Sequence, residues 1–221
     1  MNILITAGGT KEFIDGVRYL GNASSGQTGA ILADYLSSKD HSVVWLGATD
    51  AVKPQSANQA YFFTDYDELA KSLKSLLSEQ AFDAVFHAAA VSDYKVTGIQ
   101  SGGNQLSPDR NLKISSGSET LKLTLSKQPK IINHLVDWSV NKQLKVIGFK
   151  LTNTEETNQQ QQAVNKLLSQ PGIYAVAHND LHDMSELHHP FRLHVHDRDA
   201  FACADIKAVV NVLMTLWEMG Q

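Results

Sequence analysis

The sequence contains very little cysteine: Cys203 is the only one in 221 residues. A single cysteine excludes an internal disulfide framework and is typical of a protein from a reducing compartment. Cys203 lies in the short apolar run of residues 201–204, which we interpret as part of a helix core. We therefore expect this thiol to be buried and to behave as a small hydrophobic side chain.

The sequence also lacks an excess of basic residues and any long apolar run. The 19 Lys and Arg residues face 23 Asp and Glu residues, so the formal net charge is −4, which argues against nucleic-acid binding. No stretch approaches the roughly 18 apolar residues that cross a membrane, and the first residues lack the basic leader of a signal peptide. We expect a cytoplasmic protein with neither nucleic acid nor membrane as a partner.

What the chain does contain is an alternation of short apolar runs with stretches of helical periodicity. Runs that are apolar on both faces are typical of parallel strands between two helix layers. We predict an α/β fold with a doubly wound, mostly parallel, Rossmann-like sheet, forming one nucleotide-binding domain over residues 1–221. The expected strands are 2–6, 42–46, 60–63, 83–88, 145–149 and 173–177, and the expected helices are about 26–38, 66–79, 129–137, 155–169 and 203–218.

Residues 95–127 interrupt this alternation. Residues 95–117 are rich in Gly, Ser, Asn and Asp, which predicts a long loop, and residues 121–125 alternate between apolar and polar side chains, which predicts a strand with one solvated face. We interpret the whole segment as an inserted flap with an antiparallel excursion outside the main sheet. A long polar loop in a compact domain is either functional or disordered, and composition does not decide between the two.

The first strand is followed by a candidate binding loop. Gly8 and Gly9 come directly after the strand and allow close approach of a ligand, although a simple tight turn also explains them. Ser24 or Ser25 is a plausible N-cap for the next helix, whose N-terminus can bind an anion; capping alone is the alternative. The glycine spacing differs from the dinucleotide fingerprint and residues 42–46 end without an acidic residue, so an NAD(P)-dependent reductase is disfavoured.

Polar residues follow three further strands. Asp93, after a run of alanines that leaves space for a ligand, can orient an amide or hydroxyl group, and Lys150 can neutralise phosphate. Asn179 and Asp180 can bind a base or hold Mg²⁺, which uses one or two carboxylates together with substrate phosphates. Helix packing, an exposed lysine and an Asx turn are the respective structural alternatives. The histidines of residues 178–196 show no convincing ligand spacing, so we predict no protein-bound metal.

Five segments, taken in order, resemble the phosphopantothenate–cysteine ligases, also called phosphopantothenoylcysteine synthetases. They read ITAGGTKEFIDGVRYLGNASSG, HAAAVSDY, KISSGSETLKLTLSKQPKII, IGFKL and HNDL. The chain looks most like the monofunctional bacterial form, rather than the fusion with a flavin-dependent decarboxylase. The resemblance implies that CTP or ATP, with Mg²⁺, activates the carboxylate of 4′-phosphopantothenate as an acyl-nucleotide, which the amino group of cysteine then attacks. It also implies a homodimer whose flap reaches toward the neighbouring site.

The resemblance also implies roles for individual residues. Asn22 would stabilise the acyl-nucleotide and is assigned, with Lys150, as catalytic. The residues implied to bind phosphopantothenate and its phosphate are Gly8, Gly9, Thr10, Ser24, Ser25, Gly26, Ala89, Ala90, Val91 and Asp93. The residues implied to bind the nucleotide are Gly148, Phe149, Lys166, Asn179 and Asp180, and those of the flap region and the helix after it are Lys113 and Lys130.

The sequence departs from the family pattern at several of these positions. Ala23 replaces a common histidine, Gln27 stands where a basic residue is frequent, and Lys166 is all that remains of a lysine-rich patch. These departures leave the choice between CTP and ATP open. They also keep open the alternative of a paralogue that binds a nucleotide or a phosphorylated ligand without ligation.

Overall fold

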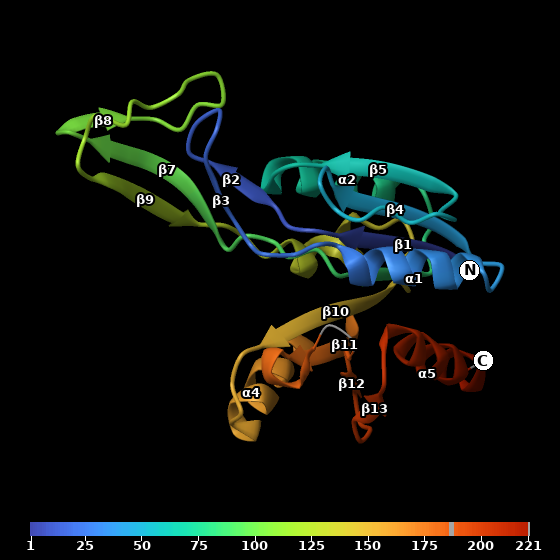
Figure 1. The fold of residues 1–221 in the computed structure, drawn as a ribbon. Coiled ribbons are helices and arrows are strands. Elements are labelled where there is room, and N and C mark those ends of the chain that lie inside the picture. Colours follow the sequence, from blue (N-terminus) through green and yellow to red (C-terminus); the bar gives the residue numbers. More distant parts are fainter. Residues whose placement is uncertain (186–187, 221) are drawn as a thin grey trace.

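The computed structural model describes residues 1–185 and 188–220, and its centre is an eight-stranded sheet of order β13-β12-β11-β10-β6-β1-β4-β5 (Figure 1). The strands from β11 to β5 in this order are parallel, whereas β12 and β13 run antiparallel at one edge. The arrangement confirms the predicted α/β fold with a mostly parallel sheet. The bounds are β1 Asn2–Ala7, β4 Ser42–Ala48, β5 Gln59–Phe63, β6 Ala84–His87, β10 Lys145–Thr152, β11 Ile173–Asp180, β12 Phe191–Val195 and β13 Phe201–Cys203.

The central strands are apolar because helices cover them. Ile3, Leu4 and Ile5 of β1 are completely buried, although neighbouring side chains of a strand point to opposite faces. Among the helices, α1 packs against α5 and α2 packs against α3, while α4 contacts β10 and β11. The helix bounds are α1 Gln27–Ser37, α2 Tyr66–Glu79, α3 Leu135–Trp138, α4 Thr157–Leu168 and α5 Ile206–Met219.

Two of the predicted helices are wrong in extent. Residues 129–137 form a short 3₁₀ helix, η1 Ile131–His134, and then the single turn of α3. The last helix starts at α5 Ile206, where the side chain of Asp205 accepts a hydrogen bond from the Ala208 N–H at 2.8 Å. Cys203 is buried as expected but belongs to β13, a strand that is too short to show an alternating pattern.

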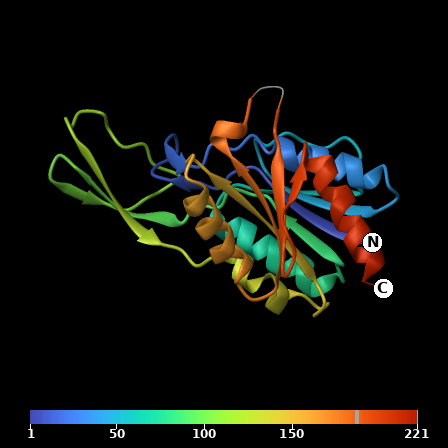
Figure 2. The same cartoon turned by 90° about the horizontal axis from the view of Figure 1, so that it is seen from below.

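The flap is a separate antiparallel sheet that extends away from the main sheet in both views (Figures 1 and 2). It consists of β7 Tyr94–Ser101, β8 Asn104–Leu106 and β9 Leu121–Lys127, in the order β8-β7-β9. The antiparallel excursion was therefore predicted correctly, but a continuous loop over residues 95–117 is wrong. Gly102 and Gly103 both have positive φ and form the two-residue turn of a hairpin between β7 and β8. These two glycines therefore mark a tight turn rather than a long loop.

A second small element lies between the main sheet and the flap. The strands β2 Lys11–Phe13 and β3 Tyr19–Gly21 pair as an antiparallel hairpin within the segment that sequence reasoning treated only as a binding loop. The hairpin starts immediately after Gly9 and Thr10 and ends immediately before Asn22. It therefore carries Asn22 at its inner end. Within the described part of the chain, no helix is both long and apolar enough to span a membrane.

Candidate functional site

The loops after β1 and β6 are joined by backbone hydrogen bonds at the carboxyl edge of the sheet, where parallel α/β proteins bind ligands. Ala90 N–H donates to the Gly8 carbonyl at 2.8 Å, and Thr10 N–H donates to the Ala90 carbonyl at 3.2 Å. Ser92 N–H donates to Thr10 Oγ1 at 2.9 Å. The structure thus brings together Gly8, Gly9, Thr10 and Ala90, all predicted from the sequence.

Asn22 lies at a cavity of about 280 Å³ beside this junction, which we call the Asn22 pocket. Four predicted residues line it. Lys11 and Asp50, which sequence reasoning missed, form an ion pair of 2.8 Å in its wall. Only the parallel pairing of β1 with β4 brings the loop of Asp50 beside that of Lys11, so no local pattern signals the contact. The complete lining is Gly9, Thr10, Lys11, Tyr19, Gly21, Asn22, Ala23, Ser24 and Asp50.

Helix α1 begins beside this pocket in a way that differs from the prediction. Its N-cap is Gly26 rather than Ser24 or Ser25, and among the described residues no side chain caps it. Ser25 Oγ instead accepts a hydrogen bond from Gln27 N–H at 3.3 Å. Gly26 has a φ of 74°, and a Cβ there would lie 2.7 Å from the Ala51 Cβ, so only glycine fits this close approach.

A larger cleft of about 500 Å³ lies between the ends of β6 and β10, the base of the flap and α4; we call it the lysine cleft. Its described lining includes four lysines and one carboxylate, Asp93, to which Lys130 donates a hydrogen bond. Such a surplus of positive charge favours an anionic ligand. The lining is His87, Ala89, Val91, Asp93, Lys127, Pro129, Lys130, Ile131, Ile132, Asn133, Phe149, Lys150, Ala163, Lys166, Leu167 and Gln170.

The lysine cleft unites residues that the sequence reasoning had divided between two ligands. Ala89, Val91 and Asp93 were assigned to phosphopantothenate, and Phe149 and Lys150 to the nucleotide, yet they line one cavity. The residues share one cavity because β6 and β10 are direct neighbours in the sheet, which no local pattern reveals. Their assignment to two different ligands stays a prediction.

Gly148 supports the floor of the lysine cleft without lining it. A Cβ on Gly148 would lie 3.0 Å from Leu167 Cδ2 and 3.1 Å from Ile132 Cδ1, and both of those side chains line the cleft. The absence of a side chain at Gly148 therefore lets Leu167 and Ile132 settle onto β10. Any larger residue would push them toward the cavity.

His87 closes the inner end of the lysine cleft as a neutral imidazole. It is buried, and its Nδ1 lies 2.9 Å from Thr6 Oγ1, which in turn accepts a hydrogen bond from Ala89 N–H at 3.1 Å. Burial lowers the pKa of His87 to about 4, because a charged ring loses its hydration there. His87 thus adds no positive charge to the cleft near neutral pH.

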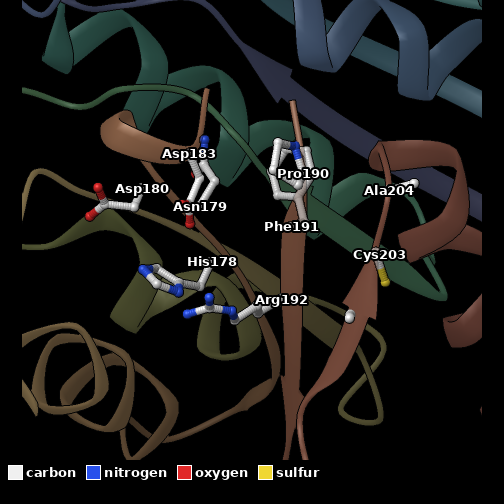
Figure 3. Close-up of a pocket in the computed structure, with 10 residues that line it drawn as sticks. His178, Asn179, Asp180, Asp183, Pro190, Phe191, Arg192, Cys203 and Ala204 are labelled. Atoms are coloured by element: carbon white, nitrogen blue, oxygen red, sulfur yellow. The ribbon is translucent and has the colours of Figure 1, made fainter. Parts of the chain in front are cut away.

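Asn179 and Asp180 lie in a different cavity of about 450 Å³, at the ends of β11, β12 and β13 (Figure 3). Asp180 is buried, and its carboxylate accepts hydrogen bonds from Thr152 Oγ1, from Thr154 N–H and from the N–H and Nδ1 of His182. These contacts, with Thr152 first, hold the pKa of Asp180 well below its usual range. Asp180 therefore stabilises a turn through these contacts, and its binding of a base or Mg²⁺ stays a prediction.

The flap-region lysines are placed differently from each other. Lys130 lines the lysine cleft, whereas Lys113 is exposed on the flap segment between β8 and β9 and lines none of these cavities. Within residues 1–185 and 188–220, no group of three or more His, Cys, Asp and Glu side chains is arranged to hold a metal ion.

Known proteins are similar to this chain in sequence and in fold. The family model of the DNA/pantothenate metabolism flavoprotein C-terminal domain matches residues 1–190. The coenzyme A biosynthesis bifunctional protein CoaBC of Thermococcus kodakarensis is 30% identical over 179 residues, which are 81% of this chain and 41% of that protein. The chain thus spans about two fifths of the length of this curated relative.

Solved structures give the same result. The DNA/pantothenate metabolism flavoprotein from Streptococcus pneumoniae superimposes on this chain with a TM-score of 0.86 at 26% identity, and the alignment covers 100% of each chain. A Cab2 mutant in complex with phosphopantothenate-cysteine shares the fold, with a TM-score of 0.76 at 20% identity over 97% of this chain and 85% of that one. Since the family model covers most of the chain, the protein belongs to the family of the DNA/pantothenate metabolism flavoprotein C-terminal domain.

Proposed function

We propose that the protein is a phosphopantothenate–cysteine ligase. It would join 4′-phosphopantothenate and L-cysteine, with CTP or ATP as the activating co-substrate, in the synthesis of coenzyme A. The observation that carries the proposal is the junction of Gly8, Gly9, Thr10 and Ala90, which connects the loop leading to the Asn22 pocket with the loop leading to the lysine cleft. An anion-binding cleft beside a pocket lined by a neutral amide suits the activation of a carboxylate by a nucleotide.

The lysine cleft is the proposed nucleotide site. Lysine ammonium groups stabilise the charge that develops as pyrophosphate leaves, and a partly enclosed cleft strengthens that interaction relative to bulk water. Asp93 suits Mg²⁺ because its side chain is 51% exposed and is hydrogen-bonded to one exposed lysine, Lys130. An exposed pair of this kind is weak and can open when a metal–nucleotide complex enters. Mg²⁺ would neutralise phosphate charge there.

The Asn22 pocket is the proposed place of the reacting carboxyl group. In the first step a carboxylate oxygen of 4′-phosphopantothenate attacks the α-phosphorus of the nucleotide, and the bond to pyrophosphate breaks. In the second step the amino group of cysteine attacks the carbonyl carbon, the nucleoside monophosphate leaves and one proton is released. The side-chain amide of Asn22 can donate a hydrogen bond to the negative oxygen in both steps, and it adds no charge of its own.

A homodimer is part of the proposal. Large apolar side chains are exposed on the flap, where water would otherwise surround them: Tyr94, Leu106, Leu112, Leu121 and Leu125. Exposed apolar groups gathered on one projecting element are typical of a surface that another chain covers. Sedimentation equilibrium would test this part, and a monomer at micromolar concentration would contradict it.

The experiment that tests the function measures pyrophosphate release with 4′-phosphopantothenate and Mg²⁺, using CTP or ATP, with and without cysteine. Release together with CMP or AMP, and with cysteine-dependent formation of 4′-phosphopantothenoylcysteine, is the expected result and would identify the nucleotide. Absence of product with both nucleotides, in a folded protein, would instead favour a paralogue that binds without ligation.

The variant Asn22→Asp tests the assigned role of its amide. Aspartate has nearly the same shape but brings a negative charge to the phosphoryl group, so product formation should be lost while the fold is kept. Thermal unfolding and circular dichroism would check the fold. Product formation close to that of the unchanged protein would remove Asn22 from the mechanism.

A further inference from the structure

Asp15 occupies the turn of the β2–β3 hairpin and is almost completely buried, with 1% of its surface exposed. Its carboxylate accepts hydrogen bonds from the N–H groups of Val17 and Arg18, at 2.9 and 2.8 Å, and from the Arg18 guanidinium, with Nε at 3.0 Å. It also accepts one from Ile114 N–H at 3.1 Å, and Ile114 is 99 residues away in the sequence. One carboxylate thus binds both the hairpin turn and the flap.

The flap is held at three further points around the same residue. Arg18 Nη2 donates to the Ile114 carbonyl at 2.7 Å, and Gly16 N–H donates to the Leu112 carbonyl at 2.8 Å. Asp15 itself forms an isolated β-bridge with Asp109. Both sequence neighbours of Lys113 are therefore fixed to the hairpin turn.

Close packing leaves little freedom in this contact. A Cβ on Gly16 would lie 2.6 Å from the Arg110 carbonyl oxygen, so the hairpin turn and the flap segment touch backbone to backbone. Ile14 is buried in a small apolar cluster with Val96 and Ile99 of the flap strand β7. The hairpin turn and the flap consequently form one packed unit, distinct from the main core.

The other end of the hairpin leads into the Asn22 pocket. From Arg18 the chain runs through β3 Tyr19–Gly21 directly to Asn22, and β3 is held in register by β2. A displacement of the flap against this short, paired strand would therefore be passed to Asn22. Catalysis that depends on the placement of reacting groups is sensitive to shifts of about 1 Å.

We propose that Asp15 is a positioning residue, which fixes the flap segment around Lys113 to the hairpin that carries Asn22. The inference rests on the proposed ligase function, because positioning has meaning only for a reaction at Asn22. The hydrogen bonds from Arg18 and from the surrounding N–H groups hold the pKa of Asp15 well below its usual range, so the carboxylate stays ionised at neutral pH.

The test uses Asp15→Asn in the full-length protein, with Asp199→Asn, at an exposed position, as the matched control. Asparagine keeps the shape but loses the charge and cannot accept every one of these hydrogen bonds. The kcat for product formation should fall by about 10- to 100-fold, while the KM for the nucleotide stays within about twofold, because Asp15 does not line the lysine cleft. Amide hydrogen exchange in residues 107–120 should become faster, with no change in the main sheet.

The outcomes separate this inference from the proposed function. No product from the unchanged protein would overturn the ligase function and the positioning role with it. An active protein whose Asp15→Asn variant keeps its kcat and its flap protection would overturn the positioning role alone. So would a variant that loses nucleotide affinity and kcat together with exchange protection in the main sheet, because that pattern means general unfolding. The variant Arg18→Lys, which keeps the charge but loses the forked geometry, should show the same exchange pattern in the flap.

Discussion

Gly9 and Asn22 meet backbone to backbone: a Cβ on Gly9 would lie 2.7 Å from the carbonyl oxygen of Asn22. The contact crosses the base of the β2–β3 hairpin and sets the distance between the end of β1 and the proposed catalytic amide. The same glycine also forms a bridge to Ala90, at the junction with the loop that enters the lysine cleft. The absence of a side chain at Gly9 thus brings three chain segments together.

Gly9→Ala should therefore impair the reaction more than the fold. The added methyl group must displace the Asn22 backbone by several tenths of an ångström, and a misplacement of about 1 Å can lower the rate roughly 100-fold. Steady-state kinetics would show a lower kcat with little change in the nucleotide KM. In the control Gly117→Ala the new Cβ meets only Ser115 Oγ at 3.5 Å, so its activity should be unchanged. Equal activity of both variants would show that the contact does not govern the site.

Replacement of Lys150 or Lys166 by Gln should weaken nucleotide binding specifically. Each lysine contributes positive charge to the lysine cleft, and a hydrogen bond to a charged group contributes about 1.5–3 kcal/mol, so the nucleotide KM should rise at least about tenfold. The difference from the unchanged protein should shrink as salt is added, because salt screens exposed charges. Lys71→Gln, on the exposed face of α2, is the matched control. An unaltered nucleotide KM for both cleft variants would show that neither lysine binds the nucleotide.

The sequence predicted the main sheet well because its strands are buried on both faces. The apolar runs of β1, β4 and β6 stand out from any solvated segment, and the alanines and glycines that follow them mark the ligand edge. The three-residue strands β2, β3 and β13 are too short to show a period of two. The assignment of Cys203 to a helix failed for that reason.

Local sequence patterns could not predict which residues share a cavity, because that depends on contacts between residues far apart in the sequence. Asp93 and Lys150 share the lysine cleft because β6 and β10 are neighbours in the sheet, where Gly148 pairs with His87. The Asp15–Ile114 hydrogen bond spans 99 residues. The hydrogen bond from Thr152 to Asp180 likewise joins adjacent strands, β10 and β11, whose paired residues lie 28 positions apart in the sequence. Long-range pairing, rather than composition, decided each case.

His87 gives a stability prediction with a definite pH range. The folded protein holds the imidazole neutral with a pKa of about 4, whereas the unfolded chain has the ordinary value of about 6.5. Between these two values the unfolded state binds the proton and the folded state does not, so stability is lost as the pH falls from about 6.5 to about 4. A shift of this size corresponds to roughly 3 kcal/mol in the free energy of unfolding.

Urea unfolding of the unchanged protein and of His87→Asn between pH 7 and pH 4 would measure this contribution. An asparagine side chain can donate or accept a hydrogen bond with Thr6 Oγ1 but does not titrate, so the unfolding free energy of the variant should fall less steeply. The difference between the two proteins isolates the contribution of His87. Burial also lowers the pKa values of His178, His189 and His194, but these residues contribute equally to both proteins. The variant His134→Asn, at an exposed ring, should follow the unchanged protein. Parallel curves for His87→Asn and the unchanged protein would mean that burial does not lower the pKa of His87, so that the ring gains its charge in the folded state below about pH 6.5 as it does in the unfolded chain.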